Sequence, residues 1–302
     1  MIIVFGSIGL DIVQMVRQLP RPGETVLTGD YVMLPGGKGA NQALAAARAG
    51  GDVSFAASIG DDDFGQRARS NLAQAGVDLS AVARRSWPTA CATISVDSAG
   101  ENQIVVSSGA NLVTTAAQLQ ADPGDLVLQQ MEIPLSEICA GVELAQQQGA
   151  RSVLNAAPFQ AIPAATLAKL NVLIVNEIEA QMLADDLGLG KADLAKVCAT
   201  VQARFAITVI LTLGADGAIA FAPDQSLRAG VLPLQALDTV GAGDAFVGAF
   251  VAAMANNTSL ADCLRWGSVA GGLACLKSGA QDGAPDRAAI EARQDEINIT
   301  AF

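Results

Sequence analysis

Short apolar runs alternate with longer Ala-, Leu- and Gln-rich stretches along most of the chain, and this alternation constrains the fold more than any other feature. Runs such as residues 2–5 and 172–175 have the length of strands that are buried on both faces. The stretches between them have the length of helices. This order is typical of βαβ units, so we predict an α/β fold with a central, mostly parallel sheet flanked by helices.

The expected elements follow from this alternation. The predicted strands are residues 2–5, 53–57, 126–130, 152–155, 172–175, 209–213 and 218–221. The predicted helices are residues 39–48, 64–75, 135–148, 177–184, 192–203, 243–255 and 260–277.

Two stretches depart from the alternation. Residues from about 14 to 34 and from about 89 to 106 show the pattern of partly exposed strands separated by turn residues. We predict that they form one small β-sheet, built from two insertions. This sheet would lie over the edge of the main sheet where we expect the active site. Because the chain shows neither a linker nor an internal repeat, we expect residues 1–302 to form a single α/β domain.

Charge and composition exclude several classes of function. The formal net charge of -12 argues against nonspecific binding to nucleic acid or to an anionic membrane, since both need clustered Lys and Arg. The chain contains no histidine, which removes Ser-His-Asp and Cys-His catalysis and histidine-bound zinc. A catalytic base must therefore be another side chain, such as Asp or Glu.

The cysteines and the N-terminal residues indicate the cellular compartment of the protein. The five cysteines are widely spaced and lack a CxxC pair, so we expect free thiols in a reducing compartment. The apolar N-terminus lacks a basic segment before it and meets Gly6 early, which favours a buried strand over a signal peptide. No uncharged apolar run approaches the ~20 residues of a membrane span. We predict a cytoplasmic protein.

The segment 238–244, Asp-Thr-Val-Gly-Ala-Gly-Asp, is the most informative one and directly precedes an apolar helical pattern. Gly241 and Gly243 allow a tight turn with exposed amides, and the following helix would point its N-terminal amides at the same place. Asp244 lies in the first helical turn, where its carboxylate could take a proton from an alcohol while the amides stabilise a transferring phosphoryl group. The alternative is an ordinary capped helix start.

A second glycine-rich segment, Pro-Gly-Gly-Lys-Gly-Ala-Asn at residues 35–41, opens another Ala-rich helix. Its glycines permit close approach to a ligand, and Lys38 and Asn41 offer hydrogen-bond donors that suit a polyhydroxylated molecule. The spacing does not fit the P-loop pattern. A purely structural loop is the alternative.

The third segment, Asn-Glu-Ile-Glu at residues 176–179, directly follows the apolar strand pattern 172–175. Polar groups at the carboxyl end of a strand lie where open α/β sheets bind ligands. Asn176 and Glu179 would share a helical face able to organise Mg²⁺ and water near phosphates. A solvated helix start is the alternative.

Taken together, these segments resemble the ribokinase-like sugar kinases, the PfkB family. The resemblance extends over nearly the whole chain and includes GSIGLD near the start, PGGKGANQA, SIGDDDFG, GAN at 109–111, QMEIP at 130–134, LNAAP at 154–158, VNEIEA at 175–180, TLGADGA at 212–218, DTVGAGDAFVGAF, and KSGAQ at 277–281. It implies the ribokinase-like fold and an ATP-dependent kinase that phosphorylates a sugar hydroxyl, with ribose, giving ribose 5-phosphate, as the expected acceptor.

The resemblance also assigns roles to residues. It implies that the sugar is bound by Asp11, Gly36, Gly37, Lys38, Asn41, Glu132 and Asp244. Asp244 would be the catalytic base, with an anion hole formed by Gly241, Ala242 and Gly243. The nucleotide would be bound by Asn176, Thr212, Gly214, Gly241 and Gly243.

Cations and a second subunit are implied in the same way. Glu179 would support Mg²⁺ through water, while Asp238, Val240 and Gly279 match the region where the family binds an activating monovalent cation, K⁺. The β-insertions would form a lid that also joins two subunits into a homodimer. The expected small-molecule partners are a sugar and ATP, with neither nucleic acid nor membrane.

One departure from the family pattern concerns the acceptor. Two residues before Asp11, ribokinases typically carry an Asn that contacts ribose, whereas this chain has Gly9. A bulkier sugar or a nucleoside could use that space. The alternatives are therefore another kinase of this family, for fructose, a ketoacid sugar or a nucleoside, and a binding regulator that has lost catalysis. A Rossmann dehydrogenase is not indicated, because no G-x-G-x-x-G follows the first strand.

Overall fold

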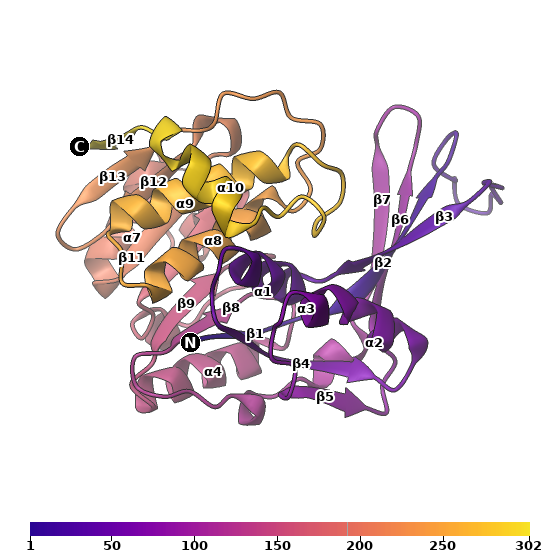
Figure 1. Ribbon diagram of the computed structural model, residues 1–302, viewed down its shortest axis with the longest axis horizontal. Coiled ribbons are helices and arrows are strands. Elements are labelled where there is room, and N and C mark those ends of the chain that lie inside the picture. The colour runs from indigo at the N-terminus through magenta and orange to yellow at the C-terminus, as the bar shows by residue number, and fades with distance from the viewer. Residues whose placement is uncertain (192) are drawn as a thin grey trace.

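The computed structural model describes residues 1–191 and 193–302, which form a large α/β body and a small sheet that projects from it (Figure 1). The large sheet has ten strands in the order β14-β13-β12-β11-β10-β9-β8-β1-β4-β5. The strands from β11 to β5 in this order are parallel, and β12, β13 and β14 add antiparallel strands at one side. In chain order these strands are β1 Ile2–Phe5, β4 Val53–Gly60, β5 Val82–Arg85, β8 Leu126–Gln129, β9 Arg151–Asn155, β10 Val172–Asn176, β11 Thr208–Thr212, β12 Ala218–Phe221, β13 Ser226–Ala229 and β14 Ile299–Ala301.

Helices cover both faces of this sheet. They are α1 Lys38–Arg48, α2 Asp63–Ala68, α3 Ser70–Gln74, α4 Leu135–Gln147, α5 Ala164–Leu167, α6 Glu177–Asp186, α7 Leu194–Phe205, α8 Ala242–Ala255, α9 Leu260–Ala274 and α10 Arg287–Arg293, with short 3₁₀ turns η1 Gly109–Val113, η2 Ala116–Gln118, η3 Gly214–Asp216 and η4 Gln294–Glu296. No helix in the described ranges is long and apolar enough to cross a bilayer.

The helix predicted over 64–75 is wrong in one respect, because the segment forms two helices that break at Arg69. The hydroxyl of Ser70 donates to the carbonyl of Arg67, a local bond that competes with the helical ladder. The helix predicted to end at 277 ends at Ala274. Residue 192, the first of the predicted helix 192–203, lies outside the described residues.

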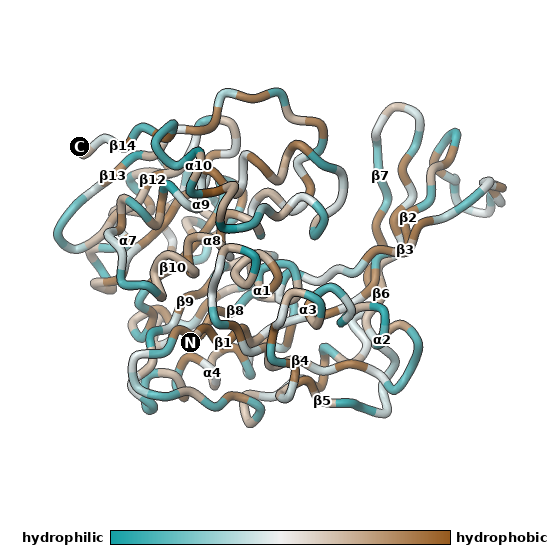
Figure 2. Tube along the Cα trace, in the orientation of Figure 1, coloured by the Kyte–Doolittle hydropathy of each residue, from teal (hydrophilic) through white to brown (hydrophobic). Residues whose placement is uncertain are grey.

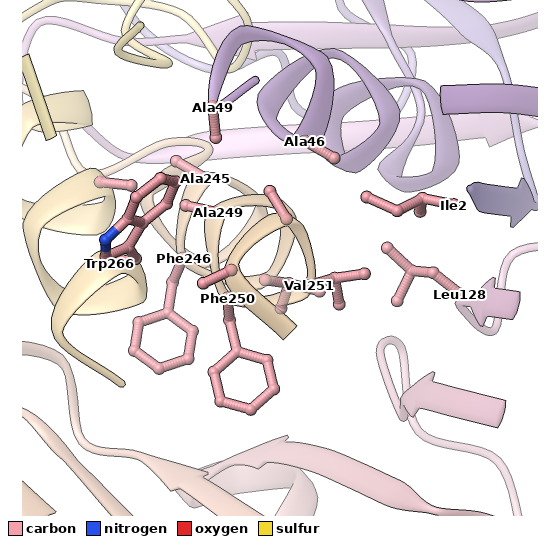
Figure 3. Close-up of a cluster of buried hydrophobic side chains, with 14 of the residues drawn as sticks. Ile2, Ala46, Ala49, Leu128, Ala245, Phe246, Ala249, Phe250, Val251 and Trp266 are labelled. Atoms are coloured by element: carbon pink, nitrogen blue, oxygen red, sulfur yellow. The ribbon is translucent and has the colours of Figure 1, made fainter. Parts of the chain in front are cut away.

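The core between α1, α8 and the sheet determines where the candidate site lies. Small side chains let the two helices approach closely, as Figure 3 shows for Ala245 and Ala249 of α8, which lie toward α1. Val251 lies on the side of Ile2 and Leu128, so α8 also packs onto the central strands. This packing brings the first turns of α1 and α8 together, although the two helices are far apart in the sequence (Figure 1).

The small sheet has the strand order β3-β2-β6-β7, with β2 Gly9–Met15, β3 Tyr31–Gly36, β6 Ala90–Val96 and β7 Asn102–Ser107. It projects from the body at the right of Figure 1, and Figure 2 shows hydrophobic segments where its strands leave the body. The predicted fold class, a mostly parallel sheet flanked by helices with a separate small β-sheet, is confirmed. The strands differ from the predicted insertions in that β2 begins at Gly9 and residues 16–30 form no strand.

Candidate active site

The start of α8 forms a turn with free amides. Gly241 precedes the helix with φ 79°, a left-handed conformation that glycine adopts without strain. The N–H groups of Gly243 and Asp244 donate no hydrogen bond to the described residues, as is usual in a first helical turn. Nothing lies within 4 Å of the place where a side chain on Gly243 would begin, so the turn is open to a ligand. Free amides at a helix N-terminus suit an anion.

Asp244 follows in the first turn of α8 and is buried. Its Oδ2 accepts a hydrogen bond from Nδ2 of Asn41 at 3.0 Å, and its Oδ1 accepts one from Nε2 of Gln42 at 2.8 Å. Both donors come from the first turns of α1. The carboxylate is thus held by two amide groups beside the amides of its own helix.

The glycine segment before α1 is held by a hydrogen bond to Glu132. Gly37 is the last residue before the helix and has φ 91°. This left-handed conformation directs the N–H of Lys38 toward Glu132. Oε2 of Glu132 accepts hydrogen bonds from N of Lys38 at 2.8 Å and from Oγ of Ser7 at 2.6 Å. Lys38 has a raised pKa, chiefly because of the negative charge of Asp244, with Glu132 and Glu179 adding to it. A lysine ammonium therefore lies among three carboxylates.

A cavity of about 450 Å³ lies next to these residues, between the small sheet and the carboxyl ends of β1 and β8. It is lined by Gly9, Leu10, Asp11, Gly37, Ala90, Cys91, Ala92, Val106, Ser108, Asn111, Leu112, Met131, Glu132, Ile133, Pro134, Pro158 and Gln160. Burial, with a further contribution from Glu132, raises the pKa of Asp11 to about 6. The cavity thus combines apolar walls with a few convergent polar groups, as small-molecule sites do.

Gly9 does not leave the open space that its lack of a side chain suggests. A Cβ at this position would lie 2.8 Å from the carbonyl oxygen of Ala90, the residue that pairs with Gly9 across the small sheet. The neighbouring strand β6 therefore occupies the place next to Gly9. Gly9 nevertheless lines the cavity, so the expectation that a bulkier acceptor uses the space there stays a prediction.

Asn176 and Glu179 lie at the start of α6 and cap it reciprocally. Oδ1 of Asn176 accepts from N of Glu179, and Oε2 of Glu179 accepts from N of Asn176, both at 2.9 Å. Burial, together with the charge of Asp244, raises the pKa of Glu179. Thr212 is the register partner of Asn176 on the next strand, and Gly214 follows with open space beside it. These four residues share one edge of the large sheet.

Asp238 joins two loops near the start of α8. Its Oδ1 accepts from N of Val240 at 3.0 Å, and its Oδ2 accepts from N of Gly279 at 3.1 Å. The residue after Gly279, Ala280, packs so closely on Gly241 that a Cβ there would lie 2.6 Å from the Cα of Ala280. The segments predicted to hold a monovalent cation are thus adjacent to the predicted anion hole.

The described residues contain no group of three or more His, Cys, Asp or Glu side chains that could enclose a metal ion. The two implied cations nevertheless suit the donors present. The Asp238 carboxylate and the backbone carbonyls of the two loops it joins offer the oxygen ligands that a hard monovalent cation takes. Glu179 presents a buried carboxylate, which suits Mg²⁺ held through water.

The structure thus brings together Asp11, Lys38, Asn41, Glu132 and Asp244, with Glu179 close enough to raise the pKa of Lys38 and to be influenced by the charge of Asp244. Asn41 does not line the cavity; it contacts Asp244 instead. Sequence reasoning missed the buried polar residues Ser7, Gln42, Gln130, Asn155 and Gln281, which bond to this group or to one another. All five lie inside the segments singled out in the sequence, but spacing alone did not indicate which way their side chains point.

Comparison with known proteins identifies the relatives of this chain. The model of the pfkB family of carbohydrate kinases matches residues 1–287. A ribokinase from Haemophilus influenzae is 35% identical over 290 residues, covering 94% of this chain and 95% of the relative. The crystal structure of ribokinase from Thermotoga maritima superposes with a TM-score of 0.89 at 30% identity, covering 96% of this chain and 98% of that one. Ribokinase from Arabidopsis thaliana, solved with ribose and ATP, gives a TM-score of 0.88 at 28% identity, covering 97% and 98%.

Proposed function

This chain belongs to the pfkB family of carbohydrate kinases, and from this premise we propose that it transfers the γ-phosphoryl group of ATP to a hydroxyl of ribose, giving ribose 5-phosphate. It is a phosphotransferase with an alcohol group as acceptor. The observation that carries the proposal is the buried Asp244 carboxylate beside the free amides of Gly243 and Asp244. A base and an anion site are the two groups that phosphoryl transfer to an alcohol requires.

In the proposed reaction, Asp244 accepts the proton of the attacking hydroxyl as its oxygen forms a bond to the γ-phosphorus. The bond between that phosphorus and the bridging oxygen of ADP breaks, and ADP leaves with the negative charge. In the anion hole expected at Gly241, Ala242 and Gly243, the free N–H of Gly243, joined by that of Asp244, would stabilise the charge on the transferring group, because the N–H of Ala242 already donates to the carbonyl of Thr239. The ionised carboxylate accepts two amide hydrogen bonds and so keeps its lone pairs oriented before the sugar arrives.

The sugar would occupy the cavity under the small sheet. Asp11 and Glu132 are hydrogen-bond acceptors on its wall, and sugar hydroxyl groups are donors. Gly36, Gly37 and Lys38 would complete this binding site from the loop before α1. The relative from Arabidopsis thaliana that contains both ribose and ATP supports this pair of substrates.

The nucleotide would lie on the other side of Asp244, near Asn176, Thr212 and Gly214. Mg²⁺ would be held through water by Glu179, and would neutralise charge on the phosphates when bound. K⁺ would be held by Asp238, Val240 and Gly279, next to the anion hole. An acidic protein needs such cations to hold a tetra-anionic nucleotide.

We propose that the small sheet is a lid over the sugar and that it joins two copies of the chain. Asp11, Ala92 and Val106 are register neighbours that face the cavity. Two residues further out, on the same face, an apolar row runs across all four strands: Val32, Val13, Ile94 and Ile104. Val32 and Ile104 are exposed and Val13 and Ile94 are half-buried, and a row of this kind favours burial against a second copy. The free thiols suit a reducing compartment, so we propose the cytoplasm.

The acceptor is tested by measuring ADP release with a panel of pentoses, hexoses and nucleosides. We expect the highest kcat/KM with ribose. A higher value with fructose, a ketoacid sugar or a nucleoside would instead identify another kinase of the family. Tight sugar binding with no ADP release from any compound would indicate a regulator that lacks catalysis.

A further inference from the structure

Five buried side-chain amides lie around the carboxylate of Asp244: two layers of two, and Asn155, whose Oδ1 also accepts from Nε2 of Gln42 at 2.9 Å. The inner layer is Asn41 and Gln42, each of which donates to one carboxylate oxygen. The outer layer is Gln281 and Gln130. Nε2 of Gln281 donates to Oδ1 of Asn41 at 3.0 Å, and Nε2 of Gln130 donates to Oε1 of Gln42 at 2.7 Å.

The chemistry of an ionised carboxylate fixes the direction of every bond in this cluster. A carboxylate only accepts hydrogen bonds, so Asn41 and Gln42 must turn their NH₂ groups toward Asp244. Their carbonyl oxygens then point away from it and need donors of their own. Gln281 and Gln130 supply these donors, and an inner amide turned the other way would present an oxygen to the negative charge.

The outer amides are themselves fixed by their surroundings. Oε1 of Gln281 accepts from Nδ2 of Asn71 at 2.9 Å, and the backbone oxygen of Gln281 accepts from the guanidinium of Arg48. Gln130 is fully buried, and its own Oε1 has no hydrogen-bond partner in the described residues. The hydrogen bond that its amide makes in the described residues is the one to Gln42.

We propose that Gln281 and Gln130 are positioning residues that set the orientation of Asn41 and Gln42, and through them hold the Asp244 carboxylate in the geometry that accepts the proton. Neither residue touches the substrate in this account. The inference rests on the proposed function, because the role it gives to Gln281 and Gln130 is a role in phosphoryl transfer. It also links the loop that carries Gly279 to the catalytic base, since Gln281 lies in the same loop.

The test replaces each outer amide by Met, which has a similar length and no strong hydrogen-bonding group. We expect Gln281→Met and Gln130→Met each to lower kcat at least tenfold, with the KM for sugar within about threefold of the wild type, because binding does not use these bonds. Gln129→Met is the matched control. Gln129 is a fully buried neighbour on the same strand that bonds Ile138 instead, so its replacement should leave kcat within about twofold.

A double-mutant cycle separates positioning from a general structural effect. In an Asp244→Asn background there is no carboxylate to orient, so adding Gln281→Met should lower the residual rate by less than about twofold. An equal drop in both backgrounds, or a wild-type kcat in both single variants, would overturn the inference. A wild-type enzyme that phosphorylates no sugar would instead refute the proposed function. If the fully buried Gln130→Met fails to fold, Gln281→Met in its loop still decides the question.

Discussion

Nδ2 of Asn41 lies 3.0 Å from Oδ2 of Asp244, across a separation of 203 residues in the chain. The contact exists because α1 and α8 pack against each other through small side chains and start at the same edge of the sheet. The glycine-rich segment before α1 therefore lies next to the glycine-rich segment before α8, where the free amides are. Sugar, base and phosphate are expected to meet at this junction.

Replacing Asp11 by Asn should weaken sugar binding and, at high pH, stabilise the free protein. The pKa of Asp11 is raised from 3.8 to about 6 by burial, so its protonated form is the one that folding favours. That contribution to stability is complete below about pH 4 and is lost as pH rises through 6. We expect Asp11→Asn to gain about 1–3 kcal/mol in free energy of unfolding over the wild type at pH 8.

The same two proteins, compared at a lower pH, provide the control for this prediction. At pH 5 the carboxyl is mostly protonated in the folded protein but mostly ionised in the unfolded chain, so denaturant unfolding should give a stability difference roughly half of that at pH 8. The KM of the wild type for sugar should rise as pH falls below 6, because a protonated Asp11 accepts hydrogen bonds less well. A stability difference that is the same at both pH values would contradict the assignment.

Potassium should stimulate the enzyme through Asp238. The carboxylate joins the loops of Val240 and Gly279, and the resulting oxygen donors suit a monovalent cation. We expect ADP release to rise severalfold when KCl replaces Tris chloride at constant ionic strength, and Asp238→Asn to lose most of this stimulation. Full wild-type activity with Na⁺ or Tris as the monovalent cation would count against the K⁺ site.

Ile104→Lys should convert a dimer into a monomer. Ile104 belongs to the apolar row across the small sheet and is 53% exposed in the single chain. A buried lysine at an interface would lose its hydration without a partner. The matched control is Val105→Lys, on the same strand and the opposite face, which should leave the molecular mass by light scattering unchanged. A monomeric wild type would refute the proposed dimer.

Sugar should slow hydrogen exchange in the small sheet. A kinase must exclude water from its phosphoryl group, so we expect the segments 14–34 and 89–106 to close over bound sugar. Helix α7, Leu194–Phe205, is packed on the large sheet and should show unchanged exchange. Equal exchange in the small sheet with and without sugar would mean that it is not a moving lid.

Local patterns in the sequence predicted most of the fold. The continuous apolar runs at 2–5 and 218–221 became β1 and β12 with the predicted bounds, because burial on both faces leaves little freedom in where such strands end. The edge strand β14, Ile299–Ala301, could not be predicted in this way. It is three residues long and partly exposed, so it is fixed by pairing with β13 and not by its own pattern.

The site was predictable to the extent that it lies on helix starts. Glycine followed by a helical pattern identified Gly241 and Asp244 without any knowledge of the tertiary structure. The roles of Gln130 and Gln281 could not be predicted, because an amide's partners depend on which way a buried side chain points across the core. The same limit applied to Gly9, where the sequence showed a missing side chain but not the strand that fills its place.

The central claim is that Asp244 is the base, and the turnover of Asp244→Asn tests it most directly. The substitution keeps the shape and removes the proton acceptor, so kcat should fall by on the order of 10²–10⁴. Binding of sugar and nucleotide, measured by calorimetry on protein with a wild-type circular dichroism spectrum, should stay within about tenfold. A folded Asp244→Asn enzyme that turns over its best sugar at nearly the wild-type rate would contradict the account.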